Sequence, residues 1–407
     1  MIKRHLESAL TEPSLGRQMR FVAGPRQAGK TTLARHILGA NRSKNLYFNW
    51  DLRDVRDLYR TDASFFETAL RDAGASGIRP WVCFDEIHKM AKWKNILKSY
   101  FDKYEDMCRF IVTGSARLDW FRRSGDSLAG RYFLFRLNPL TLSEVAGRIC
   151  PAPGRDENAL AFIERKTASA RYEKDLMEQL LRTSGFPEPF LKADETFYRR
   201  WQRDMVDHLV REDVRDLTRI LAVDHVAALM QILPDRIRSP LSLNSLSQDV
   251  GTSYTAAKNA VNALQLTYAL FLVSPYSEKI ARAVRKEKKG YFYDWGRCRD
   301  SARRFENYAA VELKALTDFW HDRGIADFDL RYVRTRDGRE TDFLITRDRK
   351  PWCLFEIKLT DESIARHHLD HAKALGDIPI VQLVSESPVF KKQSPKAFRL
   401  SASRFFG

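Results

Sequence analysis

The chain has 407 residues, of which 44% are hydrophobic, and 69 Lys and Arg against 53 Asp and Glu give it a formal net charge of +16. This length favours two to four domains, and no apolar run approaches the roughly 18 residues that a membrane span needs. We therefore expect no membrane segment, and the charge favours an anionic partner such as DNA over charge that only maintains solubility.

The five cysteines are scattered along the chain, and none stands in C-x-x-C spacing. This pattern argues against a zinc ribbon and against a disulfide framework. The N-terminal residues are basic but lack the apolar stretch of a signal peptide. A reducing cytoplasmic setting is therefore predicted.

Residues 1–150 alternate strand-like and helix-like segments, which is typical of an α/β fold with a parallel sheet. The expected strands are 18–24, 46–50, 80–85, 109–114 and 131–137.

The stretch after the first expected strand reads G-x-x-x-x-G-K-T, the phosphate-binding P-loop, and a helix-like segment follows it. The lysine can reach the β- and γ-phosphates of ATP, and the threonine after it can place its hydroxyl on Mg²⁺. The alternative is a glycine-rich turn that matches by accident. The predicted nucleotide-binding residues are Gly24, Pro25, Arg26, Gln27, Ala28, Gly29, Lys30, Thr31 and Thr32.

An apolar strand over 80–84 ends in two carboxylates, Asp85 and Glu86. Carboxylates at the carboxyl end of a parallel strand face the P-loop. We expect Asp85 to hold Mg²⁺ through water and Glu86 to act as the general base on the attacking water.

Two further catalytic residues are expected downstream. Ser115 directly follows the strand over 109–114 and can orient the attacking water, or it is an ordinary turn residue. Arg131 is the first choice for an arginine that offsets transition-state charge, often from a neighbouring subunit. A transferred arginine argues for a homo-oligomer, for which a ring is one form. Its rivals, any of which is otherwise plain surface charge, are Arg117, Arg122 and Arg123.

These strings, with Asp-Glu-Ile-His-Lys after the third strand and Ser-Leu-Ala-Gly-Arg near 130, resemble a family of prokaryotic AAA+-type ATPases whose C-terminal region is uncharacterised. Residues 184–189 and 210–214 also resemble the family's linker, so the resemblance spans nearly the whole chain. It implies an ATPase with ATP and Mg²⁺ as cofactors, and it does not say on what the ATPase acts.

The composition changes to a turn-rich break near 150, becomes mostly helical, and later returns to strands. We predict an ATPase core over 1–150, a helical lid or linker over 151–235, a winged helix-turn-helix over 236–299 and a nuclease-like α/β domain over 300–407.

A short helix over 243–250 closed by Gly251, and a second helix capped by Ser253, follow helix-turn-helix logic. Ala257, Val261 and Leu264 share the inner face. Strands near 270–273 and 290–293, joined by a basic loop, would make the wing. The alternative is a unit that binds protein or only stabilises the fold. The predicted DNA-contacting residues are Tyr254, Thr255, Lys258, Asn259, Asn262, Arg285, Lys286, Lys288 and Lys289.

Two strands near the C-terminus carry Asp342 and, two residues apart on one face, Glu356 and Lys358. This pattern resembles the PD-(D/E)xK nuclease fold, and Glu306 matches the acidic residue of its preceding helix. The resemblance implies that Glu306, Asp342 and Glu356 bind Mg²⁺ while Lys358 steadies charge or activates water. The alternative to a nuclease fold is a salt-bridged surface strand. The motif's leading proline is replaced by Glu340-Thr341, so the sequence does not decide whether the domain cleaves DNA.

Three functions remain open from the sequence. The first is an ATPase that acts on duplex or branched DNA, including Holliday-junction-like DNA, and that can also cut it. The second is a nucleotide-gated signalling, defence or toxin–antitoxin scaffold in which the nuclease-like domain is a docking module. The third is a metal nuclease that ATP only regulates.

Overall fold

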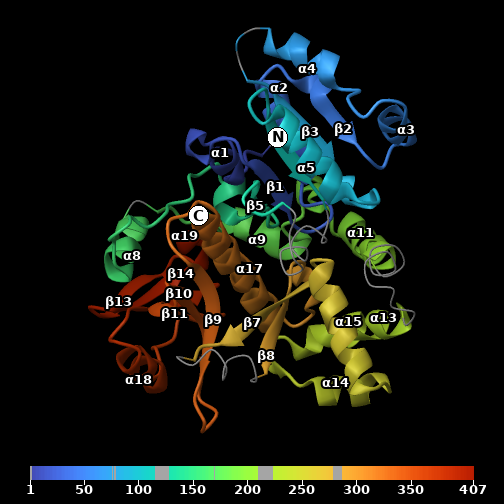
Figure 1. Ribbon diagram of the computed structural model, residues 1–407. Helices are drawn as coiled ribbons and strands as arrows, with labels where there is room; N and C mark the ends of the chain where they lie inside the picture. The colour runs from blue at the N-terminus through green and yellow to red at the C-terminus, as the bar shows by residue number, and fades with distance from the viewer. Residues whose placement is uncertain are drawn as a thin grey trace. The chain divides into compact units, whose positions relative to one another are not determined.

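A computed structural model describes residues 2–75, 77, 79–114, 128–168, 170–209, 223–277 and 287–407 (Figure 1). The chain divides into two compact units, Arg4–Leu137 and, with the first three residues, Asn138–Gly407. The first unit ends at Leu137 rather than near residue 150, because the residues that follow bond within the second unit. Leu140 N donates to Gly185 O over 2.6 Å, for example.

The first unit contains a parallel sheet whose strands, among the described residues, follow the order β2-β3-β4-β1-β5. All five expected strands are confirmed, within about two residues at each end. Since the strands are parallel, their carboxyl ends meet at one edge. Their bounds are β1 Met19–Ala23, β2 Tyr47–Asn49, β3 Trp81–Asp85, β4 Arg109–Thr113 and β5 Tyr132–Arg136.

The helices of this unit stand between its strands in the sequence, as a βα pattern requires. A cluster of aromatic rings that includes Phe66, Phe84 and Tyr100 fills part of the core, with ring centroids 5.0–5.6 Å apart. The helices are α1 Leu6–Leu10, α2 Lys30–Ala40, α3 Arg53–Thr61, α4 Glu67–Gly74 and α5 Trp93–Tyr104.

The second unit opens with helices, as the composition predicts. A capping box of Thr141 and Glu144 starts the first of them, and Ser184, with a φ of 68°, marks the expected interruption before residue 187. The helices are α7 Leu142–Val145, α8 Ala159–Ala168, α9 Lys174–Thr183, α10 Pro187–Lys192, α11 Glu195–His208 and α13 Val223–Ile232.

Helices α14 (Leu243–Val250) and α15 (Tyr254–Leu266) confirm the two helices expected here. Gly251 ends α14 in the left-handed conformation, and the Ser253 side chain caps α15 by accepting from Ala256 N. Strands β7 (Leu270–Pro275) and β8 (Lys288–Phe292) form the expected antiparallel pair, and β6 (Pro240–Leu241) adds to β8. The name winged helix stays a prediction.

Helix α17 (Ser301–Asp322) lies against the sheet of the second unit, as Figure 1 shows. Among the described residues this sheet has the order β13-β14-β12-β11-β10-β9-β7-β8-β6. Strands β7 and β9 pair in parallel, so one sheet joins the hairpin β7–β8 to the C-terminal strands. The remaining elements are β9 Phe328–Arg334, β10 Glu340–Arg347, β11 Lys350–Lys358, α18 Arg366–Ala374, β12 Ile380–Val384, β13 Phe390–Ser394, β14 Ala397–Ser401 and α19 Ala402–Phe405.

Candidate functional site

The P-loop connects the end of β1 to the start of α2, as its sequence predicts. Gly24 has a φ of 153° and Gly29 a φ of 98°, which side chains rarely allow. A Cβ atom on Gly24 would lie 2.2 Å from the carbonyl oxygen of Leu137, so only glycine fits there. The loop leads directly into the N-terminus of α2, where the free N–H groups of the helix favour binding of an anion.

Lys30 is the first residue of α2, and its side chain folds back over the loop. Its Nζ donates to the carbonyls of Gly24 over 2.9 Å and Pro25 over 2.8 Å. The ammonium is therefore held inside the P-loop, where phosphate oxygens would replace carbonyl oxygens as its acceptors.

Asp85 ends β3 and is surrounded by hydroxyl groups. Thr31 Oγ1 donates to Asp85 Oδ2 over 2.7 Å, and the Tyr47 hydroxyl donates to the same oxygen over 2.5 Å. Thr113 Oγ1 donates to Asp85 Oδ1. The two residues expected to hold Mg²⁺, Thr31 and Asp85, are thus in direct contact. This carboxylate and its three hydroxyl partners are called the hydroxyl shell below.

Tyr47 and Thr113 were not identified as site residues from the sequence. Thr113 ends β4 opposite Asp85 in the parallel register, so the rule that strand ends meet at one edge could have found it. Tyr47 lies two residues before the end of β2, and no motif marks it. Burial and the hydrogen bond to Asp85 raise the pKa of the Tyr47 hydroxyl, which keeps it a donor.

Glu86 follows Asp85 with a φ of 57° and a ψ of 25°, a left-handed conformation that is uncommon for residues with a side chain. Its backbone N–H donates to Thr113 O over 3.0 Å, and its Oε2 lies 3.4 Å from His88 Nε2. Burial raises the pKa of Glu86 to about 7, against the opposing charge of Lys30. The predicted base therefore sits beside Asp85 in a largely water-excluded position.

The remaining predictions for this site are only partly covered. Ser115 and the rival arginines 117, 122 and 123 lie outside the described residues. Arg131 is described, and its Nε donates to Asp102 Oδ1 over 2.8 Å within the same unit. Its role as a transferred arginine stays a prediction.

Helix α15 presents the two faces that its sequence predicts. Ala257, Val261 and Leu264 are buried. The predicted DNA-contacting side chains on this helix are all exposed: Tyr254, Thr255, Lys258, Asn259 and Asn262.

The basic residues of the expected wing differ in position. Lys289 is fully buried and its ammonium faces carboxylates, so it is not available to a DNA phosphate in this structure. The cause is that β8 is an interior strand of the sheet, between β7 and β6, rather than an exposed wing edge. Lys288 is half-buried, and Arg285 and Lys286 lie outside the described residues.

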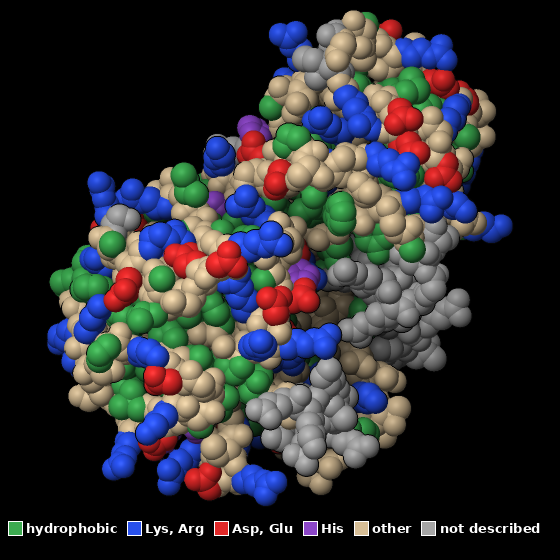
Figure 2. All heavy atoms as spheres, turned by 60° about the vertical axis from the view of Figure 1, so that its left-hand side comes forward, with side chains coloured by type: hydrophobic (Ala, Val, Ile, Leu, Met, Phe, Trp, Pro, Cys, Tyr) green, Lys and Arg blue, Asp and Glu red, His purple; other side chains and the backbone are tan. Residues whose placement is uncertain are grey.

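The net positive charge is not gathered into one basic patch on the face drawn in Figure 2, where Lys and Arg side chains are interspersed with Asp and Glu. Many of the basic side chains are paired, as in Lys392 Nζ with Glu164 Oε1 at 2.7 Å. This face therefore gives weaker support for an anionic partner than the composition alone.

The four C-terminal residues predicted from the nuclease pattern lie around the middle of the second unit's sheet. Asp342 stands on β10, and its Oδ2 accepts a hydrogen bond from Ile357 N of the neighbouring strand β11 over 2.9 Å. Glu356 Oε1 lies 3.3 Å from Lys358 Nζ, so these two side chains share one face as predicted. Glu306 projects from α17 and is 1% exposed.

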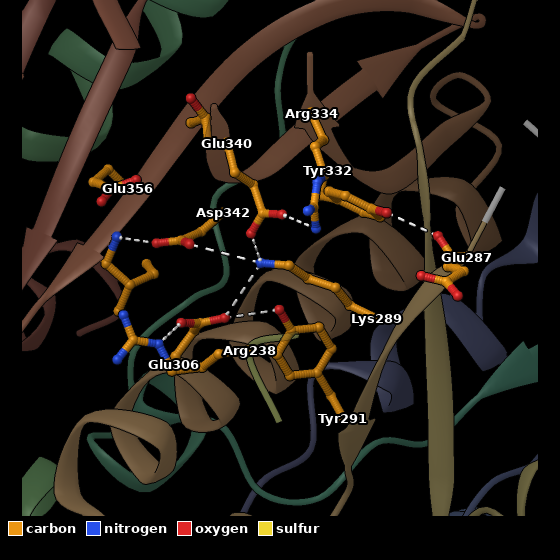
Figure 3. Close-up of polar contacts among 12 residues, drawn as sticks. Arg238, Glu287, Lys289, Tyr291, Glu306, Tyr332, Arg334, Glu340, Asp342 and Glu356 are labelled. Atoms are coloured by element: carbon orange, nitrogen blue, oxygen red, sulfur yellow. Dashed lines mark hydrogen bonds and ion pairs between the residues drawn. The ribbon is translucent and has the colours of Figure 1, made fainter. Parts of the chain in front are cut away.

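A lysine that the nuclease pattern does not contain stands among these carboxylates (Figure 3). Lys289 Nζ lies 3.7 Å from Glu306 Oε1 and 3.8 Å from Asp342 Oδ1, and it also contacts Glu340 Oε1. The described residues contain no group of three or more His, Cys, Asp and Glu side chains arranged to hold a metal ion. The predicted Mg²⁺ set of Glu306, Asp342 and Glu356 is therefore not assembled here. The carboxylates Glu306, Glu340 and Asp342 are called the carboxylate cluster below.

A histidine that the sequence did not single out, His368, contacts Glu356. His368 Nε2 lies 3.3 Å from Glu356 Oε1, and His368 Nδ1 shares a 2.8 Å hydrogen bond with Thr341 Oγ1. Although burial acts in the opposite direction, contacts with His368 and Lys358 lower the pKa of Glu356. Burial and the charges of Glu306 and Glu356 raise the pKa of Asp342. The pKa values of these two predicted metal ligands, Asp342 and Glu356, are thus shifted in opposite directions.

Two family models match this chain. Residues 16–146 match an AAA domain, and residues 174–305 match a domain of unknown function (DUF8612). The first match covers the P-loop, the parallel sheet and Asp85. Residues 16–146 are therefore an AAA-type P-loop domain that carries the residues of an ATPase site.

The relatives found add no activity. Uncharacterized proteins Rv2008c of Mycobacterium tuberculosis and Mb2031c of Mycobacterium bovis are each 22% identical over 384 residues, which is 90% of this chain and 76% of the relative. The AMPPCP-bound DnaA of Aquifex aeolicus shares 13% identity over 64% of this chain and 85% of its own, with a TM-score of 0.30. A likeness this distant carries no argument here. No helix in the described parts of the chain has the length and apolar character of a membrane span.

Proposed function

We propose that this protein hydrolyses ATP with Mg²⁺ in residues 16–146 and directs that hydrolysis at DNA through its C-terminal unit. The hydroxyl shell of Asp85 carries the ATPase part of the proposal. A carboxylate that accepts hydrogen bonds from neutral hydroxyls can accept metal-bound water as a further donor. Mg²⁺, when bound, would supply positive charge that offsets the charge of the phosphates.

The residues of the site divide the work in this proposal. Lys30 transfers its hydrogen bonds from the carbonyls of the loop to phosphate oxygens, and Thr31 and Asp85 hold the metal. Glu86, adjacent to Asp85 in a fixed left-handed turn, accepts the proton of the attacking water. Arg131 is proposed to leave Asp102 and neutralise transition-state charge in a neighbouring copy, within a homo-oligomer or ring.

The DNA part of the proposal rests on α15. Its outward face carries Tyr254, Lys258 and Asn262, side chains suited to phosphates and base edges. Its other face is buried against the unit. We propose that this helix contacts duplex or branched DNA, that residues 236–299 work as a winged helix and that residues 300–407 have a nuclease-like fold.

The experiment is the ATPase rate with single-stranded, duplex and four-way-junction DNA, with DNA cleavage followed in the same tubes. Stimulation by one DNA form that Lys258→Ala lowers, while the DNA-free rate is unchanged, supports the proposal. The matched control is Lys174→Ala, which removes an exposed lysine from α9. Equal rates with and without every DNA contradict it.

Salt dependence provides a second measurement. Several phosphate contacts would lower the affinity by roughly 10³–10⁵ between 50 and 200 mM salt. Affinity that does not change over this range would contradict phosphate contact.

A second candidate function is a nucleotide-gated scaffold whose C-terminal unit docks proteins. The observation that favours it is Lys289 within the carboxylate cluster, since a nuclease needs a metal there. This candidate predicts assembly that depends on nucleotide and an ATPase rate that DNA does not change. The free, buried cysteines accord with the cytoplasmic setting proposed for either function.

A further inference from the structure

The carboxylate cluster contains a positive charge that belongs to the chain itself. The Lys289 side chain is 0% exposed and reaches from β8 into the space between Glu306 on α17 and Glu340 and Asp342 on β10 (Figure 3). Glu306 comes from one segment, while Glu340 and Asp342 stand two residues apart on another. The lysine is the point at which they meet.

The backbone holds this lysine in place from both sides. Lys289 pairs with Val273 of β7 and with Pro240 of β6, so its Cα is fixed inside the sheet. Its ammonium also lies 5.4 Å from the ring centroid of Tyr332. Because its backbone is fixed and its side chain is fully buried, the ammonium stays among the carboxylates, whereas an exposed lysine could swing into water.

The surrounding groups complete the balance of charge. Arg238 Nε lies 2.7 Å from Glu306 Oε2, and the Tyr291 hydroxyl donates to Glu306 Oε1 over 2.9 Å. Arg334 lies 3.6 Å from Glu340. Three carboxylates thus face the ammonium of Lys289, and two of them have a second cation beside them.

We propose that the Lys289 ammonium is the resident cation of the carboxylate cluster and takes the place that a divalent metal would need. Mg²⁺ requires oxygen ligands at about 2.0–2.1 Å in octahedral geometry. An ammonium within 4 Å of the same oxygens repels a second cation and blocks its approach. The wild-type cluster therefore binds no divalent ion, and it is a latent metal site that loss of the lysine charge opens.

The proposal predicts a specific gain of function. Lys289→Met keeps most of the side-chain length and removes the charge, so it leaves buried carboxylates without their cation. The variant should unfold at a lower temperature than wild type. Mn²⁺ should restore the melting temperature, because the ion replaces the missing charge.

The test uses the full-length protein without nucleotide and measures Mn²⁺ binding by electron paramagnetic resonance together with the melting temperature. Lys289→Met should bind one additional Mn²⁺ and gain stability from it. Wild type should do neither, and nor should Lys289→Met combined with Asp342→Asn. Lys288→Met, the neighbouring half-buried lysine, is the matched control and should behave as wild type.

Two results would overturn the proposal. One is a folded Lys289→Met variant that binds no additional Mn²⁺. The other is a wild-type protein that binds Mn²⁺ in a way that Asp342→Asn abolishes. The second comparison does not need the Lys289 variant, so it decides the matter even if that variant fails to fold. Neither measurement involves ATP or DNA, so the outcome is independent of the proposed function.

Discussion

Two buried aspartates of this protein, Asp85 and Asp342, stand next to predicted metal sites but have different partners. Asp85 accepts hydrogen bonds from Thr31, Tyr47 and Thr113, all neutral hydroxyls. Asp342 lies 3.8 Å from the ammonium of Lys289. A hydroxyl can stay in place when a metal arrives, whereas an ammonium must leave.

The comparison shows that a short carboxylate motif does not determine the chemistry of its site. Both aspartates adjoin apolar strand residues, which precede Asp85 and follow Asp342, and both have a second carboxylate nearby in the sequence. What separates them is the charge of a partner that comes from a distant segment. The predictions below test each side of this difference.

The largest effect is expected from Lys30→Ala. If the hydroxyl shell belongs to an ATPase site, loss of the phosphate-binding ammonium should lower the ATP hydrolysis rate by about 100- to 1000-fold. A phosphate-release assay measures this, and circular dichroism confirms the fold. Lys44→Ala, an exposed lysine of the same unit, is the control. A rate that survives Lys30→Ala would remove the distinction between the two aspartates.

Gly24→Ala should come next. The added Cβ meets the Leu137 carbonyl at 2.2 Å and requires a positive φ, so the unit should lose about 2–3 kcal/mol of unfolding free energy together with nucleotide binding. Chemical denaturation and a fluorescent nucleotide measure the two effects. Gly39→Ala, within α2, should be neutral or stabilising by about 0.5–1 kcal/mol. Similar behaviour of the two variants would refute the steric argument.

Glu312 of α17 offers a third kind of buried carboxylate, bonded to the backbone N–H of Leu142 over 2.8 Å. Burial raises its pKa to about 8, so the folded state binds its proton more tightly than the unfolded state. Stability should therefore fall as pH rises from about 4.5 to about 8, and level off above. Glu312→Gln should remove a dependence on the order of 5 kcal/mol, as expected from a pKa difference of about 3.5 units, from melting curves over this range. Glu178→Gln, on the exposed side of α9, should keep the wild-type slope; identical slopes in all three proteins would count against this assignment.

The smallest effect is expected from Tyr47→Phe, which removes one member of the hydroxyl shell and keeps the ring. Loss of a hydrogen bond to a charged carboxylate should lower kcat for ATP by about tenfold. Tyr100→Phe is the control, because its hydroxyl donates to Ala63 O, away from Asp85. Equal losses in both variants would mean that the tyrosine acts only through packing.

Local patterns in the sequence predicted much of the fold. The P-loop, the five strands of the first unit, the N-cap of α15 and its two faces were all predicted, because each depends on residues close together in the chain. Thr113 could have been added from the parallel register of β3 and β4.

The sequence could not predict the partners that come from distant segments. In the sequence, Lys289 lies in a basic segment of the kind that often binds DNA. Only the pairing of β8 with two strands places this lysine among carboxylates. The hydrogen bond from Tyr47 to Asp85 likewise depends on the lateral position of β2 beside β3. A basic run in the sequence therefore predicts positive charge, but it does not show which groups will neutralise that charge.

The close approach of Gly24 to Leu137 has a mechanical meaning. Leu137 is the last residue of the first compact unit, and the chain passes from it directly into the second. The first turn of the P-loop thus rests on the backbone at the exit of its own unit. A side chain added at Gly24 would therefore press on the backbone of the residue at which the chain leaves this unit.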